Sequence, residues 1–274
     1  PWSLISRFNA SKNGITVDHH LAAVVEKSIE AWEQSAGIFD ITIQPLVAAW
    51  GFGAKHVKKY PDSARVRSLL QCTGTDKIKL EGDHLIKTRS CIAIDVDGIA
   101  QGYSVDVLAN FLEQNNITSY IVEIGGEIRV KGRKKPGNEK MKIGIEAPGD
   151  YLFESPVMQK IISIDEGAVT TSGSYRRFHE SNGKKFSHII DPKTGYPVRS
   201  DVVSVTVFAH DAITADAYDN VLMAMGLQKA LAFAEQREDL AAYFIYKTPG
   251  GSIADTASSR FYELFVNSEV RGEK

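Results

Sequence analysis

Strand patterns outnumber helix patterns in this chain of 274 residues, and the two kinds do not alternate along it. Helical periodicity covers residues 18–36, 61–70, 98–113, 214–225 and 227–236. Most strand patterns lie between residues 119 and 209, and others return near the C-terminus. A parallel βαβ sheet needs strict alternation, so the pattern predicts an α+β fold with mixed or antiparallel sheets and packed helices. No repeat and no Pro/Gly/Ser-rich linker divides the chain, which indicates one domain or two closely packed lobes.

Individual segments carry more specific predictions. The segments SYIVEI and EIRVKG are joined by Gly125-Gly126 and predict a hairpin. The other predicted strands are IKL (78–80), CIAID (91–95), MKIGIEA (141–147), KIISID (160–165), FSHII (186–190), VVSVTVFAH (202–210), AAYFIYKT (241–248) and RFYELFV (260–266). The apolar residues expected to form one face of the helix after Gly98 are Tyr103, Val107, Leu108, Phe111 and Leu112.

The charge balance argues against nucleic acid as the main partner. The net charge is -2, whereas proteins that bind duplexes usually present a basic face. One dense basic run, Lys131 with Arg133 to Lys135, is read as a solvated turn between two strands. No segment is long and apolar enough for a membrane helix, and no signal peptide is present. The chain begins at Pro1, which predicts a mature or trimmed product.

The two cysteines, Cys72 and Cys91, fit neither a disulfide framework nor a metal-binding pattern. The preferred interpretation is two buried free thiols. A single bridge stays open as an alternative if the protein functions outside the cytoplasm.

Residues 170–198 are the most informative for function. They combine hydroxyl side chains, paired arginines (Arg176 and Arg177), His188 and the turn Asp-Pro-Lys-Thr-Gly. Loops on a rigid scaffold commonly hold binding and catalytic groups. Hydroxyl and cationic side chains at this density favour a ligand that carries phosphate. A neutral imidazole at His188 can accept a proton from an alcohol, although a histidine in a strand is more often structural.

The helix at 214–225 contains a second candidate site. Asp216, Asp219 and Asn220 are spaced i, i+3 and i+4, so they share one face, and hard oxygen ligands of this kind suit Mg²⁺ or Ca²⁺. The alternative is that the acids favour the helix dipole at its N-terminus, and spacing alone favours this alternative slightly.

Three weaker signals accompany these sites. Residues 95–103 read as a strand, a glycine turn and a helix, a place where an anion can bind, with helix capping by Asp97 as the alternative. Gly125-Gly126-Glu127 permits close approach of a ligand, but a plain hairpin turn is the better interpretation. Trp50 can stack on a flat ring, although the protein core is its more usual place.

Six motifs follow one another along the chain: SRFN (6–9), GIFDITIQPLVAAWGFG (37–53), IDVDGIAQGYSVD (94–106), IVEIGGEIRVKG (121–132), AVTTSGSYRRF (168–178) with SHIIDPKTGYPV (187–198), and TADAYDN (214–220). In this order they resemble the motifs of the ApbE family of FAD:protein FMN transferases. The resemblance implies a single ApbE-like flavin transferase domain over residues 1–274, from which the family's first strand and helix are missing.

The activity that the resemblance implies is Mg²⁺-dependent. FAD would be cleaved, FMN would be attached through a phosphoester to a threonine of a target flavoprotein, and AMP would leave. The acceptor would carry a Ser/Thr-x-Ala-Thr type motif. The implied metal ligands are Gly98, Asp216, Asp219 and Asn220. The implied FAD-binding residues are Ile38, Phe39, Asp40, Asp95, Gln101 and Ile190. His188 is the expected catalytic base.

Two positions depart from the family pattern. Asn220 stands where threonine is usual, and Gln101 stands where lysine or glutamate is common. Asn220 bears on metal affinity, and Gln101 bears on how the adenine or ribose end of FAD is held. Two other functions remain open: an FAD pyrophosphatase that releases FMN and AMP, and a flavin-binding protein without turnover. The resemblance further implies a periplasmic location, or an inner-membrane anchor facing the periplasm, and allows a lipid anchor outside this chain.

Overall fold

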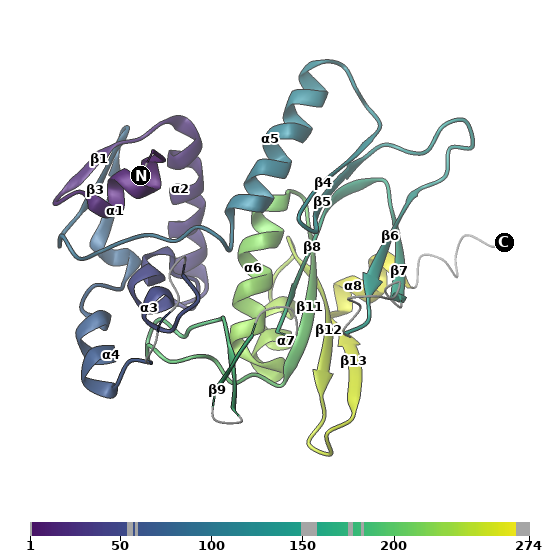
Figure 1. Cartoon of the computed structure of the whole chain (residues 1–274). Coiled ribbons are helices and arrows are strands. Elements are labelled where there is room, and N and C mark those ends of the chain that lie inside the picture. The colour runs from purple at the N-terminus through teal and green to yellow at the C-terminus, as the bar shows by residue number, and fades with distance from the viewer. Residues whose placement is uncertain are drawn as a thin grey trace. The chain divides into compact units, whose positions relative to one another are not determined.

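The protein is described by a computed structural model that covers residues 2–53, 57, 60–148, 158–174, 178–181 and 184–266, with the backbone alone at 178–181 and 184–186. The chain divides into two compact units (Figure 1). The first unit comprises Pro1–Ala100 and Phe178–Arg199, and the second comprises Gln101–Arg177 and Ser200–Lys274. In the described residues, no helix has the length and apolar character needed to cross a membrane.

The elements confirm an α+β fold. The helices are α1 (Leu4–Ala10), α2 (His19–Gln34), α3 (Gln44–Ala49), α4 (Ser63–Leu70), α5 (Ala100–Gln114), α6 (Ala212–Met225), α7 (Leu227–Glu235) and α8 (Ser259–Phe265), with short 3-10 turns η1 (Ile41–Ile43) and η2 (Thr75–Lys77). The strands are β1 (Gly14–Thr16), β2 (Ile78–Glu81), β3 (His84–Lys87), β4 (Tyr120–Ile124), β5 (Glu127–Lys131), β6 (Met141–Glu146), β7 (Met158–Ile164), β8 (Glu166–Gly173), β9 (Phe178–Ser181), β10 (Lys184–Ser187), β11 (Val202–Ala209), β12 (Ala241–Lys247) and β13 (Ile253–Ala257).

The first unit packs helices beside a three-stranded antiparallel sheet of order β1-β3-β2. Helix α2 begins where Asp18 accepts a hydrogen bond from the Leu21 amide, and it buries one apolar stripe. The buried Lys87 ammonium donates to the carbonyl oxygens of Phe8 and Ile92, at 2.9 and 2.7 Å. Burial lowers the pKa of Lys87, and the carbonyl acceptors compensate for its lost hydration.

A disulfide joins Cys72, just after α4, to Cys91, in the turn after β3. Their Cα atoms lie 5.5 Å apart, within the usual range for a bridge. The preferred interpretation of two free thiols is therefore wrong, and the alternative of a single bridge is confirmed. Sequence spacing did not reveal the pair, because the two segments are brought together only when the first unit folds.

Removal of this bridge is expected to destabilise the first unit. Its cysteines are 19 residues apart. Closing a loop of that length restricts the unfolded chain enough to contribute about 3 kcal/mol. A Cys72→Ser/Cys91→Ser variant should therefore unfold at lower urea concentration than the oxidised protein. Dithiothreitol should produce the same shift in the wild type and none in the double variant. An unchanged urea midpoint in both tests would contradict the prediction.

The second unit is built on a six-stranded antiparallel sheet of order β13-β12-β11-β8-β5-β4. Helices α5 and α6 cover one face, where Val105, Tyr120 and Ala212 belong to one core cluster. On the other face the β6–β7 hairpin and α8 form a larger core, which includes Ile162 and Phe261 (Figure 1). The metal-binding residues predicted on α6 therefore lie on the helix-covered side of this sheet.

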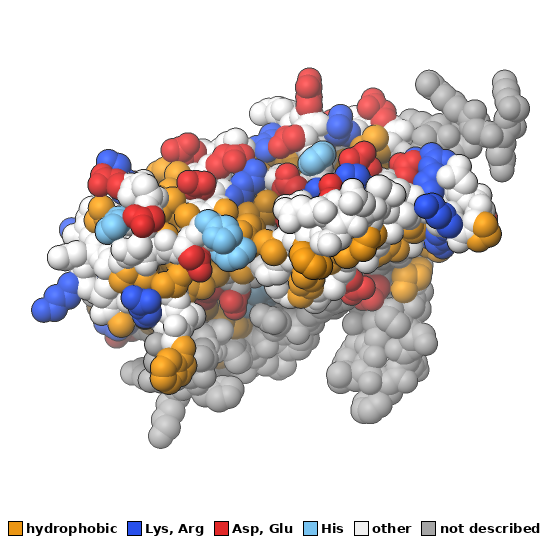
Figure 2. All heavy atoms as spheres, turned by 90° about the horizontal axis from the view of Figure 1, so that it is seen from above, with side chains coloured by type: hydrophobic (Ala, Val, Ile, Leu, Met, Phe, Trp, Pro, Cys, Tyr) orange, Lys and Arg blue, Asp and Glu red, His pale blue; other side chains and the backbone are white. Residues whose placement is uncertain are grey.

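Most of the predicted elements are present. The five predicted helices correspond to α2, α4, α5, α6 and α7, and the Gly125-Gly126 hairpin is confirmed by the pairing of Ile124 with Glu127. The basic run after Lys131 lies between β5 and β6, as expected, where Arg133 pairs with Asp165 at 2.7 Å. On the face in Figure 2, acidic and basic side chains are intermixed, in keeping with the small net charge.

Two predicted strands are wrong, and a third is found only in part. Residues 91–95 follow an irregular path after the disulfide, and residues 260–266 belong mostly to α8. The aromatic residues of that segment suggest a strand, but Phe261 and Phe265 are four residues apart and pack into the core as one helical face. For FSHII, the strand β10 ends at Ser187, and Ile190 makes an isolated bridge with Pro197.

The apolar face predicted for α5 is not the side of the helix that is buried. Leu108 and Phe111 are 46% and 60% exposed. The buried residues are Gly102, Val105, Asp106 and Ala109. Two of these are small and one is charged, so hydrophobicity alone selected the wrong side of the helix. The small side chains let the α5 backbone approach the rest of the second unit closely.

Candidate metal and flavin site

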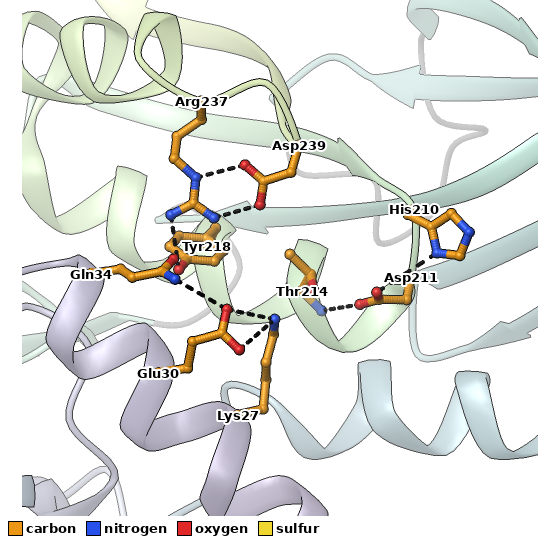
Figure 3. Close-up of polar contacts among 9 residues, drawn as sticks. All are labelled: Lys27, Glu30, Gln34, His210, Asp211, Thr214, Tyr218, Arg237 and Asp239. Carbon is orange, nitrogen blue, oxygen red and sulfur yellow. Dashed lines mark hydrogen bonds and ion pairs between the residues drawn. The ribbon is translucent and has the colours of Figure 1, made fainter.

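Helix α6 places two of the predicted ligands in a buried environment. The helix begins where Asp211 accepts a hydrogen bond from the Thr214 amide at 2.9 Å (Figure 3). One turn later Asp216 is 4% exposed, and Asp219 is 2% exposed. Isolated carboxylates are almost never buried so deeply. Their burial indicates a specific role rather than a favourable interaction with the helix dipole at the surface.

The pKa of Asp216 is raised to about 7, chiefly by burial. Repulsion from Glu127 adds to the rise, and a hydrogen bond from the Gly102 amide at 2.8 Å opposes it. Burial likewise raises the pKa of Asp219 well above its ordinary value, with repulsion from Asp216 and Glu127 adding to the effect. These carboxyl groups are therefore close enough to compete for protons.

Asn220 supports this arrangement from the same helix. Its side-chain amide nitrogen donates to the Asp219 carboxylate at 2.9 Å and to the main-chain oxygen of Asp216 at 3.1 Å. The residue that departs from the family pattern therefore contacts both of the acidic positions. It restrains the Asp219 side chain.

Glu127 belongs to the Gly125-Gly126-Glu127 motif, but the sequence interpretation assigns it no role in metal binding. It begins β5 directly after the glycine turn, is 9% exposed and repels both aspartates. The sequence favours a plain hairpin turn for this motif, and the turn is present. The available signal was an acidic residue at the first, inward-facing position of a strand. Gly125 has φ +68°, a left-handed backbone conformation that glycine adopts without steric cost, and it lies against the side-chain amide of Gln101.

The donor chemistry fits a hard divalent cation such as Mg²⁺. Among the described residues, no set of three or more His, Cys, Asp and Glu side chains is arranged so that it holds a metal ion. Mg²⁺ does not require such a cage, because it is usually bound by one or two carboxylates together with waters and substrate phosphates. Asp216 and Asp219 supply two carboxylates. Gly98, predicted as a further ligand, belongs to the first unit, and its role stays a prediction.

The residues predicted to bind FAD lie mainly in the first unit. Asp40 is 8% exposed, and it accepts hydrogen bonds from the Thr42 amide and hydroxyl and from the Thr75 amide and hydroxyl, at 2.6 to 3.2 Å. Its pKa is raised by burial, which those four bonds oppose. Asp40 therefore links η1 to η2 through hydrogen bonds. Phe39 is also buried, whereas Ile38 is half-buried.

Asp95 lies beside η1, because its amide donates to the carbonyl oxygen of Ile41 at 2.7 Å. Its carboxylate accepts from the Asp97 amide at 3.0 Å, and burial raises its pKa. Thus η1 and the segment before α5 lie together within the first unit. The described helix α5 begins at Ala100, and the alternative that Asp97 caps it stays a prediction.

The remaining predicted residues occupy different surroundings. His188 is half-buried, with its ring centroid 6.4 Å from that of Phe52. Ile190 is 4% exposed and packs in the core cluster that contains Trp50, which confirms the core interpretation of that tryptophan. Gln101 is exposed and belongs to the second unit, against Gly125. Arg176 and Arg177 lie outside the described residues.

The fold and the acidic site define an α+β protein with two compact units, one of which carries buried oxygen ligands on a helix beside an antiparallel sheet. A sequence profile of the ApbE family matches residues 1–244. This chain belongs to the ApbE family.

Curated relatives and solved structures agree. The FAD:protein FMN transferase of Haemophilus influenzae is 36% identical, covering 97% of this chain and 78% of that protein. The protein of the same name from Vibrio cholerae is 37% identical, over 94% of this chain and 77% of its own length. The solved flavin transferase ApbE from Vibrio cholerae superposes with TM-score 0.84 at 35% identity, covering 96% of this chain and 83% of that one. The apo flavinyl transferase ApbE of Pseudomonas stutzeri gives TM-score 0.85 at 33% identity, over 96% of this chain and 81% of that one.

Proposed function

We propose that this chain is an FAD:protein FMN transferase that works with Mg²⁺ and modifies a threonine of a flavoprotein. The observation that carries the proposal is the buried pair Asp216 and Asp219, with Glu127 beside it, in a member of the ApbE family. Buried carboxylates that raise one another's pKa are costly in a protein that only needs to fold. Their presence in the interior is explained if they bind a cation together with the phosphates of the substrate.

The reaction transfers a phosphoryl group. The acceptor hydroxyl oxygen forms a bond to the phosphorus of the FMN half, the bond from that phosphorus to the bridging oxygen breaks, and AMP leaves with the electron pair. The hydroxyl proton passes to a base, which we assign to the His188 imidazole. Such reactions depend mostly on positioning and on neutralising charge. A bound Mg²⁺ would supply charge neutralisation at the pyrophosphate. Asp216 and Asp219 would hold it, and Asn220 would keep Asp219 in place.

Replacing His188 by asparagine tests the assignment of the base. Because asparagine cannot accept the proton, FMN transfer should slow by about a hundredfold, while the dissociation constant for FAD changes far less. Stopped-flow or quench measurement of transfer, with FAD binding followed by fluorescence, separates the two quantities. His84→Asn, an exposed histidine on β3, is the control. Loss of FAD binding before loss of transfer would show that His188 contacts the ligand and is not the base.

The function as a whole is tested by product analysis. The protein is incubated with FAD and a peptide of the Ser/Thr-x-Ala-Thr type, with Mg²⁺ or with EDTA, and the products are separated by mass. We expect AMP and flavin-labelled peptide in equal amounts, and only when Mg²⁺ is present. AMP and FMN without labelled peptide would identify a pyrophosphatase. Unchanged bound FAD after prolonged incubation with Mg²⁺ would identify a flavin-binding protein without turnover.

We further propose that the protein works in an oxidising compartment, with the periplasm as the expected one. The Cys72–Cys91 bridge supports this location, because disulfides persist outside the cytoplasm. Fractionation of cells that produce the protein at natural levels, followed by alkylation of free thiols, tests the proposal. A cytoplasmic protein that is fully alkylated without prior reduction would contradict it.

A further inference from the structure

Helix α5 contacts the start of α6 through two residues one turn apart, Gly102 and Asp106. The Gly102 amide donates to Asp216. A Cβ atom at position 102 would lie 2.7 Å from the Asp216 Cβ atom and would overlap the carbonyl oxygen of Ala212. The Asp106 carboxylate accepts hydrogen bonds from the amides of Ala212 and Ile213, at 3.0 and 2.8 Å. Residues four apart share a helix face, so one side of α5 contacts and hydrogen-bonds the turn that leads to Asp216.

The charge of Asp106 is balanced by Arg129 on β5. The guanidinium donates to the Asp106 carboxylate at 2.7 Å, and the two side chains are only 14% and 9% exposed. A buried ion pair needs its remaining hydrogen-bonding capacity satisfied, and here the Ala212 and Ile213 amides provide that. A carboxylate beside the first amides of a helix also stabilises its positive end. Loss of Arg129 would leave an uncompensated charge against the start of α6.

Glu113, with its partners Tyr120 and Lys131, contacts the other side of the Arg129 guanidinium. Glu113 lies 3.8 Å from the second guanidinium nitrogen and accepts hydrogen bonds from the Tyr120 hydroxyl and the Lys131 ammonium, at 2.6 and 2.7 Å. The pKa of Glu113 is lowered by the bonds from Lys131 and Tyr120, which keep it charged. The guanidinium is therefore fixed between two carboxylates, one of which contacts α6.

We infer that Asp106 and Arg129 are positioning residues that set the place of the α6 carboxylates for the divalent cation. The inference rests on the proposed function. Ala212 and Ile213 precede Asp216 by about one helical turn, so a shift at those amides moves the ligand itself. Groups that orient metal ligands without touching the metal typically change metal affinity by about tenfold or more when removed. A purely structural role would instead lower stability and leave the affinity of the folded protein unchanged.

The second unit offers a matched control in Arg237. Its side chain is 16% exposed, it pairs with Asp239 at 2.5 and 2.7 Å, and it donates to the hydroxyl of Tyr218 on α6 at 3.1 Å (Figure 3). Arg237 thus resembles Arg129 in burial, in its aspartate partner and in contacting α6. It differs in contacting the middle of the helix instead of the first amides.

The test is a titration of the full chain with Mn²⁺, followed by electron paramagnetic resonance in the absence of FAD. We expect Arg129→Met and Asp106→Asn to raise the Mn²⁺ dissociation constant by about tenfold or more. Arg129→Lys, which keeps the charge, should recover part of the affinity. Arg237→Met should stay within about twofold of the wild type, because Arg237 contacts α6 at Tyr218 and not at the amides that precede Asp216. Circular dichroism confirms that each variant is folded.

The outcomes separate this inference from the proposed function. Wild-type affinity in folded Arg129→Met and Asp106→Asn would overturn the positioning role. Equal loss of Mn²⁺ affinity in Arg129→Met and Arg237→Met would overturn it too, since a general destabilisation of α6 would then explain both results. A wild-type protein that binds Mn²⁺ no better than Asp216→Ala would instead remove the proposed metal site. The inference is supported if Mn²⁺ affinity falls only in Arg129→Met and Asp106→Asn and partly recovers in Arg129→Lys.

Discussion

Replacing Asp216 by alanine is expected to reduce the Mg²⁺-dependent release of AMP from FAD by about a thousandfold, because loss of one preorganised electrostatic group commonly costs a hundred- to a thousandfold in rate. Asp216 supplies a carboxylate that no neighbour can replace: Asp219 is restrained by Asn220, and Glu127 extends from another element. Chromatographic measurement of AMP and FMN at saturating FAD gives the rate directly.

A control shows that this effect belongs to the site. Asp201 lies in the same unit and accepts a hydrogen bond from the Leu227 amide at the start of α7, at 2.9 Å. Asp201→Asn should lower stability slightly and leave the rate of AMP release near that of the wild type. Full activity in Asp216→Ala would contradict the assignment of this carboxylate to the metal, whatever the behaviour of the control.

The second large effect is on stability: replacing Asp216 is expected to stabilise the folded protein, although it removes activity. Burial raises the pKa of Asp216 from its ordinary 3.8 to about 7 in the folded state, so the folded protein binds this proton more tightly than the unfolded chain. The contribution of Asp216 to stability is therefore greatest below the unfolded pKa, and it is lost as the pH rises through the range from about 4 to about 7. The full difference corresponds to about 4 kcal/mol at most. Asp216→Asn removes this penalty and still offers an oxygen to the Gly102 amide.

Urea denaturation in EDTA should therefore show Asp216→Asn to be more stable than the wild type at pH 8, by about 2 to 4 kcal/mol, with a much smaller difference near pH 4.5. Adding Mg²⁺ should stabilise the wild type at pH 8 and leave the variant nearly unchanged, since a ligand stabilises only a state that binds it. Glu26→Gln, an exposed carboxylate on α2, should follow the wild type at every pH. Equal or lower stability of Asp216→Asn at pH 8 without metal would show that the buried carboxylate imposes no penalty.

Local signals in the sequence predicted the elements whose cause is local. Helix α2 has its capping Asp18 and an apolar stripe, and the β4–β5 hairpin has its glycine turn. Asp216, Asp219 and Asn220 lie within five residues, so helical spacing alone places them together. This part of the site follows from one stretch of chain.

Interactions across the fold decided the features that the sequence did not reveal. Glu127 joins the acidic cluster only because β5 lies beside the strand that α6 covers. Asp106 is buried because Arg129, 23 residues away, neutralises it, and so the hydrophobic stripe of α5 points elsewhere. For the same reason the Cys72–Cys91 bridge was not visible in the spacing of the cysteines. Charge pairing, close backbone packing and long-range loop closure leave no periodic trace in the sequence.

Anomalous diffraction from crystals grown with Mn²⁺ and FAD tests the central claim most directly. The account predicts a metal peak within about 2.2 Å of carboxylate oxygens of Asp216 or Asp219, with pyrophosphate oxygens completing its coordination. Bound FAD with both carboxylates far from any metal or phosphate would contradict it.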